Sequence, residues 1–232
     1  MIRWLGPSDP FPPVETALSD PNGLLAAGAD LSAARLLDAY RRGIFPWSAD
    51  DEPILWWTPD PRMVLFVDEL HVSHSLRKRL RSRRFTVTAD RAFSDVVAGC
   101  ARPRADGEGT WITGAVADAY SELHRRGHAH SVETWLESEL VGGLYGVSIG
   151  RMFYGESMFA REPDASKVAL ACIVGQLRRW DFELIDCQMS TDHLATLGAR
   201  DIPRHEFVAR LKELTARPPV VSPWKLDEDL TG

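Results

Sequence analysis

The chain has 232 residues, of which 44% are hydrophobic and 26% charged, as in ordinary folded globular proteins. Its net charge of −6 argues against a general nucleic-acid binder, and its most apolar stretch, residues 168–174, is far too short to cross a bilayer. The chain lacks the leading apolar stretch of a signal peptide, and Cys100, Cys172 and Cys187 are too widely spaced for a zinc site or a disulfide framework, so we expect a cytoplasmic protein without a metal.

The first quarter of the chain is rich in proline, glycine and tryptophan and contains one clear helix, expected over 32–42. A serine is well placed to cap this helix and a glycine to end it. The dipeptide Asp60-Pro61 is a plausible boundary. We therefore expect a small N-terminal domain over 1–62 and a larger domain over 63–232.

A strongly basic helix is expected over 73–84, which contains six cations and no acid and so leaves a charge of −12 on the rest of the chain. Arg77, Arg81 and Arg84 share one helical face, next to Lys78. Such a run is often only a solvated face. Solvated helices usually interleave acids with their cations, however, and none stands here, which favours contact with a polyanion.

Short strands are expected on either side of the basic helix, at 63–67 and 85–88. Helices follow over 90–100 and 114–126, and the loop between them, 102–109, is charged and contains two glycines.

The stretch from 129 to 188 is more regular. It contains three successive strands, a helix and a final strand, expected over 131–136, 140–149, 151–158, 164–180 and 182–187. Hairpins followed by a helix and a strand that returns to the sheet predict an α+β domain. This order resembles the acetyltransferase-like (GNAT) fold, although a fold does not by itself define chemistry.

Eight tryptophans are unusual for this length. Trp47 follows a proline, and Trp111 follows the glycine-containing stretch 107–110. A loop tryptophan is most often a satellite core residue, but it can also stack on a nucleic-acid base. The basic stripe in the same chain favours the stacking interpretation.

Three polar residues stand in apolar strands of the larger domain. Glu156 lies within the expected strand 151–158, and Asp186 and Gln188 lie at the end of the last one. Glu156 could simply face outward; if it points inward, we expect a cationic partner, because a buried unpaired charge is very costly. Polar residues at a strand end line sites and begin turns about equally often, so the pattern alone leaves both open.

Taken together, several segments resemble the leucyl/phenylalanyl-tRNA–protein transferase family. They occur in family order from about residue 11 to 210, which makes coincidence very improbable. The matching segments are Pro21-Asn22-Gly23-Leu24-Leu25-Ala26, Tyr40-Arg41-Arg42-Gly43-Ile44-Phe45-Pro46-Trp47, Pro53-Ile54-Leu55-Trp56-Trp57, Gly109-Thr110-Trp111-Ile112-Thr113, Gly127-His128-Ala129-His130-Ser131-Val132-Glu133, Leu140-Val141-Gly142-Gly143-Leu144-Tyr145-Gly146-Val147, Tyr154-Gly155-Glu156-Ser157-Met158-Phe159 and Ile185-Asp186-Cys187-Gln188.

The resemblance implies a small N-terminal domain and a GNAT-like C-terminal domain. It implies transfer of leucine, phenylalanine or methionine from aminoacyl-tRNA to proteins that begin with Arg or Lys, which marks them for degradation by the N-end rule pathway. No cofactor is implied, because an aminoacyl ester is already activated and needs no ATP, metal or covalent nucleophile.

The resemblance also implies roles for individual residues. Trp47 and Trp111 would hold the terminal adenosine, and Asp186 would orient Gln188, whose carbonyl accepts a proton of the attacking amine. The basic-helix residues that touch tRNA would be Arg77, Lys78 and Arg81. The substrate-binding residues around an apolar pocket would be Leu144, Phe153, Glu156, Met158, Ile173, Leu177 and Ile185. Ile173 and Leu177 stand where the family has aromatic residues, which bears on pocket size and on the ranking of Leu against Phe.

Two other functions are compatible with the same patterns. An acetyl-CoA-dependent acetyltransferase would need a glycine-containing pyrophosphate turn before its helix, and residues 161–167 contain no glycine. A non-catalytic tRNA-binding module would explain the basic helix and the tryptophans, but not Glu156, Asp186 and Gln188 beside an apolar pocket.

Overall fold

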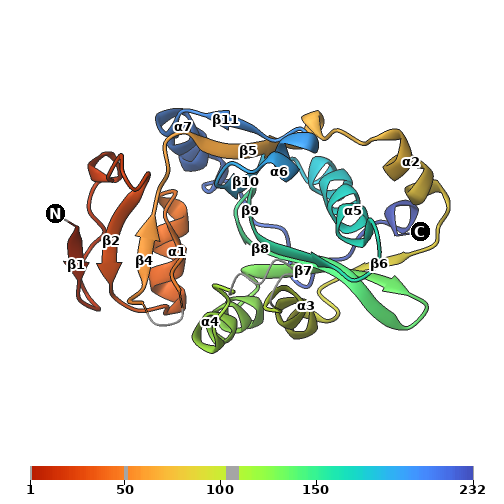
Figure 1. Cartoon of the computed structure of the whole chain (residues 1–232), viewed down its shortest axis with the longest axis horizontal. Helices are drawn as coiled ribbons and strands as arrows, with labels where there is room; N and C mark the ends of the chain where they lie inside the picture. Colours follow the sequence, from red (N-terminus) through yellow and green to blue (C-terminus); the bar gives the residue numbers. More distant parts are fainter. Residues whose placement is uncertain (1, 50–51, 103–109, 232) are drawn as a thin grey trace.

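The computed structural model describes residues 2–49, 52–102 and 110–231. Strands form a four-stranded sheet in the order β1-β2-β4-β3 and a seven-stranded sheet in the order β11-β5-β10-β9-β8-β7-β6 (Figure 1). Helices and strands are mixed along the chain, which confirms the α+β class. Nearly all of the loop predicted at 102–109 lies outside the described residues.

The smaller sheet is built entirely from the N-terminal quarter. Its strands are β1 (Arg3–Leu5), β2 (Leu24–Gly28), β3 (Phe45–Pro46) and β4 (Leu55–Trp57), accompanied by the short helix η1 (Val14–Thr16). The predicted helix is confirmed as α1 (Ala33–Arg41), capped by the Ser32 side chain, which accepts the Arg35 N–H. The strands are too short for a periodic pattern, and every residue of β2 is buried, so alternation could not reveal them.

The larger sheet carries the predicted hairpins. Its strands are β5 (Arg62–Phe66), β6 (Thr86–Ala89), β7 (Ala129–Leu136), β8 (Glu139–Ile149), β9 (Met152–Ala160), β10 (Leu184–Gln188) and β11 (Arg200–Ile202). Helix α5 (Ala165–Arg179) connects β9 to β10, and these two strands are parallel, as the predicted returning strand requires. The prediction that the strand at 182–187 is the last one is wrong, because β11 follows and pairs with β5.

The remaining helices surround this sheet. They are η2 (Val67–Glu69), α2 (His74–Arg81), α3 (Phe93–Cys100), α4 (Gly114–Arg125), α6 (Asp192–Thr196), α7 (Arg204–Leu214) and η3 (Glu228–Leu230). Helices α3 and α4 cover one face of β7 and β8, and α5 covers the other (Figure 1). The two faces carry separate hydrophobic clusters.

The basic helix is shorter than predicted. It ends at Arg81, Ser82 caps it, and Arg83 adopts a positive φ of 47° that turns the chain away. The prediction that Arg84 shares the helical face of Arg77 and Arg81 is therefore wrong. Arg84 instead pairs with Glu162 at 2.8 Å.

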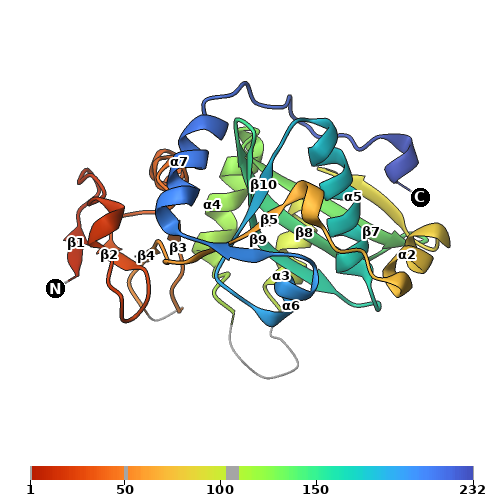
Figure 2. The ribbon, with the colours of Figure 1, turned by 90° about the horizontal axis from the view of Figure 1, so that it is seen from above.

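The small sheet packs beside the large one (Figure 2). One hydrophobic cluster continues from the small sheet and α1 into α3, α4 and α7. The small sheet ends at Trp57 and the large one begins at Arg62. We propose that the boundary predicted at Asp60-Pro61 divides the chain into a small unit, 1–62, and a larger one, 63–232. None of the helices in the described ranges has the length and apolar character needed to span a bilayer.

Candidate active site

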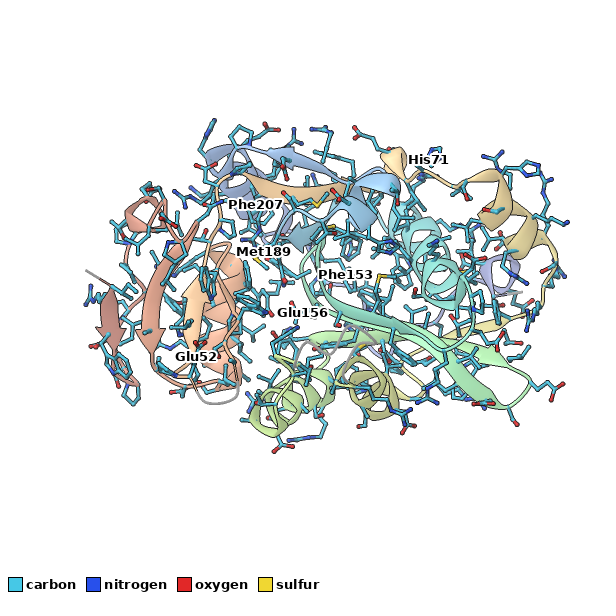
Figure 3. The ribbon with its side chains drawn as sticks, viewed as in Figure 1. Glu52, His71, Phe153, Glu156, Met189 and Phe207 are labelled. Atoms are coloured by element: carbon cyan, nitrogen blue, oxygen red, sulfur yellow. The ribbon has the colours of Figure 1, made fainter. Side chains whose placement is uncertain are left out.

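A buried carboxylate lies where the small unit meets the larger sheet. Glu156, on β9, is only 9% exposed and accepts hydrogen bonds from the hydroxyls of Tyr40 at 2.7 Å and Tyr120 at 3.0 Å. The side-chain Nε2 of Gln188 donates a third, at 3.2 Å. The two tyrosine hydroxyls also contact each other. Elements α1, α4, β9 and β10 thus converge on one side chain (Figure 3).

A β-bulge aims Glu156 at this point. In the β8–β9 pairing, Tyr145 faces Ser157 and Gly146 faces Gly155, so Glu156 is an extra residue. The bulge exchanges the faces of β9. Before it, Tyr154 packs in the cluster that contains α1, α3 and α4, whereas after it Met158 packs against α5. One extra residue therefore lets the same strand supply the carboxylate and a residue of the opposite apolar cluster.

The expectation that an inward Glu156 has a cationic partner is wrong. Its three hydrogen-bond partners among the described residues are neutral, two phenols and an amide. Removal from water raises its pKa to about 7, although the three donors pull it down. At neutral pH both protonation states are therefore populated, and the ionised form lacks a countercharge.

Asp186 has the countercharge that Glu156 lacks. Both side chains of the pair Arg62–Asp186 are buried, with Arg62 Nε 2.8 Å from Asp186 Oδ1 and Nη2 2.7 Å from Oδ2. The Arg62 guanidinium lies between the rings of Phe45 and Phe207 and donates to the Gly43 carbonyl at 3.2 Å. This pair ties β5, β10, α7 and the small unit together.

Gln188 is held by two different groups. Its backbone N–H donates to Asp186 Oδ1 at 2.9 Å, and its φ is 64°, with a register shift between Asp186 and Gln188. Its side-chain amide nitrogen faces Glu156, so its carbonyl oxygen is turned away from that carboxylate. The expected orientation of the Gln188 side chain by Asp186 is therefore corrected. Asp186 fixes the backbone, and Glu156 fixes the side chain.

The predicted apolar pocket residues come from three strands and one helix, and they lie in one cluster. Those on the strands are Leu144, Phe153, Met158 and Ile185, and those on α5 are Ile173 and Leu177. Met158 is partly exposed, and the other five are buried. The six residues therefore share one apolar cluster on the α5 face of the sheet, and their role in binding the donor stays a prediction.

The two predicted tryptophans lie on different units. Trp47 is 41% exposed and meets Trp57 edge-on at a centroid distance of 5.8 Å. Trp111 is half-buried and meets Tyr120 edge-on at 6.3 Å. Trp111 therefore contacts the ring of Tyr120, whose hydroxyl donates to Glu156.

The basic helix presents free cations. Arg77, Lys78 and Arg81 are exposed, and no ion pair to any of them is found in the described ranges. Arg79, by contrast, lies 3.7 Å from Asp164. Helix α2 lies at the end of the molecule opposite the small sheet (Figure 1).

Comparison with known families decides the class of the protein. A family model described as "Leucyl/phenylalanyl-tRNA protein transferase" matches residues 64–212, and a model of that family's N-terminal domain matches 29–60. The chain belongs to the leucyl/phenylalanyl-tRNA protein transferase family. It is therefore an enzyme, an aminoacyltransferase that moves an aminoacyl group from tRNA to protein. Family membership thus favours neither an acetyl-CoA-dependent acetyltransferase nor a non-catalytic tRNA-binding module.

Relatives of that name match along almost the whole chain. The one from Nitrosospira multiformis is 61% identical over 92% of this chain and 92% of its own. The one from Thiobacillus denitrificans is 61% identical over 94% and 95%, and the one from Nitrosomonas europaea is 56% identical over 100% and 98%.

Solved structures are more distant. "The structure of L-PGS from Bacillus licheniformis" covers 73% of this chain and 56% of its own at 10% identity and a TM-score of 0.38. A "GCN5-related N-acetyltransferase from Kribbella flavida" covers 71% and 59% at 9% identity and a TM-score of 0.35. These likenesses are too remote to bear on activity.

Three members of this network were not predicted from sequence as site residues. Tyr40 and Tyr120 stand on apolar helical faces and therefore look like core residues, and Arg62 stands at the predicted unit boundary. The carboxylates that they contact lie 36 to 124 residues away along the chain. The described ranges contain no group of three or more His, Cys, Asp or Glu residues suited to a metal ion.

Proposed function

We propose that the enzyme transfers leucine, phenylalanine and also methionine from aminoacyl-tRNA to the α-amino group of proteins that begin with Arg or Lys, and so marks them for N-degron (N-end rule) degradation in the cytoplasm. One observation carries the acceptor choice: Glu156 is a buried carboxylate whose partners are neutral donors. Such a group favours a cation brought by the substrate. An N-terminal Arg or Lys brings one on its side chain, near the reacting amine.

The reaction is an ester-to-amide exchange. The neutral α-amino nitrogen attacks the ester carbonyl carbon, a C–N bond forms, and the C–O bond to the ribose breaks; the amine loses a proton and the ribose oxygen gains one. With a pKa of about 7.7–8.0, an α-amino group is already partly neutral at pH 7. Orientation of the two substrates therefore supplies much of the acceleration.

We assign Gln188 as the catalytic residue that orients the amine, because its carbonyl oxygen is turned away from Glu156 and accepts no hydrogen bond from the residues that the structure describes, so it can accept an amine N–H. An amide is barely basic, so this role is orientation more than proton abstraction. Asp186 becomes a positioning residue in this scheme, because its carboxylate is buried against Arg62 and reaches Gln188 through the backbone.

The donor's side chain would contact the apolar cluster on the α5 face, where Met158 is partly exposed. Leu144, Phe153, Met158, Ile173, Leu177 and Ile185 offer aliphatic, aromatic and thioether surface. One methylene changes selection in such a pocket by only about 1–3 kcal/mol, so Leu, Met and Phe can share it. Trp47 and Trp111 would hold the terminal adenosine.

Replacing Trp111 by Ala is expected to weaken donor binding by about 1–3 kcal/mol, the value of one lost base stack. The measurement is the KM for aminoacyl-tRNA at saturating acceptor. Trp4→Ala is a matched control, because Trp4 is 67% exposed on β1 of the four-stranded sheet. A Trp111→Ala variant that binds donor normally but loses stability would return this residue to the core.

Changing Arg77, Lys78 and Arg81 to Glu is expected to weaken tRNA binding and flatten its salt dependence. Each lost phosphate contact reduces the slope of log K against log salt by about 0.7–0.9. Transfer from a minimal aminoacyl-adenosine donor should remain unchanged, since that donor does not reach α2. Equal loss with both donors would place the tRNA path elsewhere.

The whole proposal is tested by one transfer assay with charged tRNA and four peptides. We expect transfer of Leu and Phe to peptides that begin with Arg or Lys, and none to a peptide that begins with Asp or has a blocked amine. Similar rates on Arg- and Asp-starting peptides would refute the acceptor assignment.

A further inference from the structure

A segment that follows the residues matched by the family model packs against the larger unit. Residues 223–231, here called the strap, follow α7 and lie beyond the matched range 64–212. The second residue of the strap, Trp224, is buried, and its ring stacks on that of His130 at 3.8 Å. The Trp224 backbone N–H donates to Asp90 Oδ2 at 2.6 Å, and His130 Nδ1 lies 2.8 Å from the same carboxylate oxygen. The start of the strap is therefore anchored in the core.

The rest of the strap is fixed to α5 and to the edge strand β6. The backbone N–H of Asp227 donates to the buried Gln176 side chain at 2.7 Å. Arg179 forms ion pairs with the strap carboxylates at 2.5 and 2.6 Å. The Thr231 carbonyl accepts the Val87 N–H at 2.9 Å, which adds a backbone hydrogen bond to β6. The end of the strap thus holds the strand that directly follows α2.

Leu230 is the apolar side chain of the strap in this region, next to Asp229, which lines the same cavity. It packs over Gly175 of α5, where a Cβ atom would lie only 3.1 Å from Leu230 Cδ2. Leu230 also lines a cavity of about 200 Å³ whose lining includes Arg79 and Leu80 of α2 and Arg83. The strap and the basic helix therefore line one cavity. Both figures place the end of the chain at the same end of the molecule as α2 and α5 (Figures 1 and 2).

Helix α2 needs such support. It has eight residues and only one that is buried, Leu76. Helices this short are marginal by themselves, and neighbouring cations on one face repel each other. Leu76 and Leu80 pack on the α5 cluster, but Arg79 and Leu80 also border the cavity, so the position of α2 depends in part on the residues that line the rest of it.

We propose that the strap is a positioning element for tRNA. Through Leu230 and β6 it fixes the position of α2, so that the cations of α2 contact the tRNA in a fixed arrangement. This inference rests on the proposed contact of Arg77, Lys78 and Arg81 with tRNA. It assigns to this segment a role in donor affinity that acts through α2.

Two variants disrupt the contact between Leu230 and Gly175. Leu230→Ser removes the Leu230 side chain, and Gly175→Leu places a side chain of α5 where Leu230 packs. Val221→Ser is the matched control, because Val221 is 84% exposed just before the strap. Hydrogen exchange of residues 74–81 and tRNA affinity are measured on each full-length variant. Transfer from aminoacyl-adenosine monitors the chemistry.

We expect both test variants to exchange faster over 74–81 and to bind tRNA at least about fivefold more weakly, the lower end of usual coupling between two sites. Their transfer from aminoacyl-adenosine and all properties of Val221→Ser should stay unchanged. Unchanged exchange over 74–81 would overturn the strap's role. Faster exchange with unchanged tRNA affinity would also overturn it. The Arg77, Lys78 and Arg81 to Glu variant then shows the source of the failure, because normal tRNA binding by that variant refutes the proposed contact itself.

Discussion

Replacing Asp186 by Asn is expected to lower the free energy of unfolding by about 3–5 kcal/mol, because removing one partner of a buried ion pair leaves the other charge uncompensated. Both side chains of the Arg62–Asp186 pair are essentially inaccessible, and Asp186 also accepts the Gln188 N–H. Three N–H groups donate to the two Asp186 oxygens, so an Asn amide must turn its own N–H₂ toward at least one of them, such as the Arg62 Nη2 that donates to Oδ2. Urea denaturation of the purified variant gives the loss directly.

The same variant should lose turnover where it remains folded. Asp186 fixes the backbone of Gln188, so we expect kcat to fall on the order of 10²-fold with near-normal donor KM, the signature of an interaction needed mainly in the transition state. A folded variant within a few-fold of the parent kcat would remove Asp186 from the scheme.

A double variant separates the charge from the shape. Replacing Arg62 by Met and Asp186 by Leu together should recover much of the lost stability, since an apolar pair often replaces a buried ion pair at little cost. The rings of Phe45 and Phe207 already flank position 62 and suit a methionine. Turnover should stay low, because Leu cannot accept the Gln188 N–H. Stability no better than that of Asp186→Asn would show that the carboxylate has a role beyond pairing.

Sequence periodicity predicted the larger sheet well and the smaller one poorly. Strands β7, β8 and β9 are long enough for their pattern to show, whereas β1, β3 and β4 have two or three residues each. Pattern also predicted a strand through Glu156 but not its bulge. A bulge depends on pairing with the neighbouring strand, which a local pattern does not contain.

The polar network needed long-range contacts that no spacing rule provides. Tyr40 and Tyr120 occupy apolar helical faces, so their phenols look like buried rings until α1 and α4 meet at β9. The expected cation for Glu156 was assigned by the usual rule for buried charges, and the structure pairs the available one, Arg62, with Asp186. The resemblance, by contrast, names Glu156, Asp186 and Gln188 together, and in the structure Gln188 donates hydrogen bonds to both carboxylates.

Replacing Glu156 by Gln is expected to make the ligand-free protein less sensitive to pH. The pKa of Glu156 in the fold, about 7, exceeds that of an unfolded glutamate, about 4.3. Its contribution to stability is therefore fully present below about pH 4.3 and is lost as pH rises through about 7. With 1.36 kcal/mol per pKa unit, the loss by pH 8 amounts to about 4 kcal/mol.

The measurement is the free energy of unfolding of parent and Glu156→Gln between pH 5 and 8. The difference between them should change by about 3 kcal/mol in favour of the Gln variant as pH rises. Glu139→Gln is the matched control, because Glu139 is exposed at the start of β8 and should leave the pH profile unchanged. Parallel profiles for parent and Glu156→Gln would mean that this carboxylate titrates normally.

Ionised Glu156, which destabilises the ligand-free protein, is expected to strengthen binding of the acceptor. An Arg-starting acceptor would pair with ionised Glu156, so Glu156→Gln should lower kcat/KM for that peptide by about 2 kcal/mol or more, roughly 30-fold, with normal donor KM. In the parent, kcat/KM should rise through about pH 7 as Glu156 ionises and again near the acceptor amine's pKa of about 7.7–8.0. The variant should keep only the second rise. A variant that retains both the acceptor affinity and the lower rise would show that another group recognises the cation, and Glu156 would then be reduced to positioning Gln188.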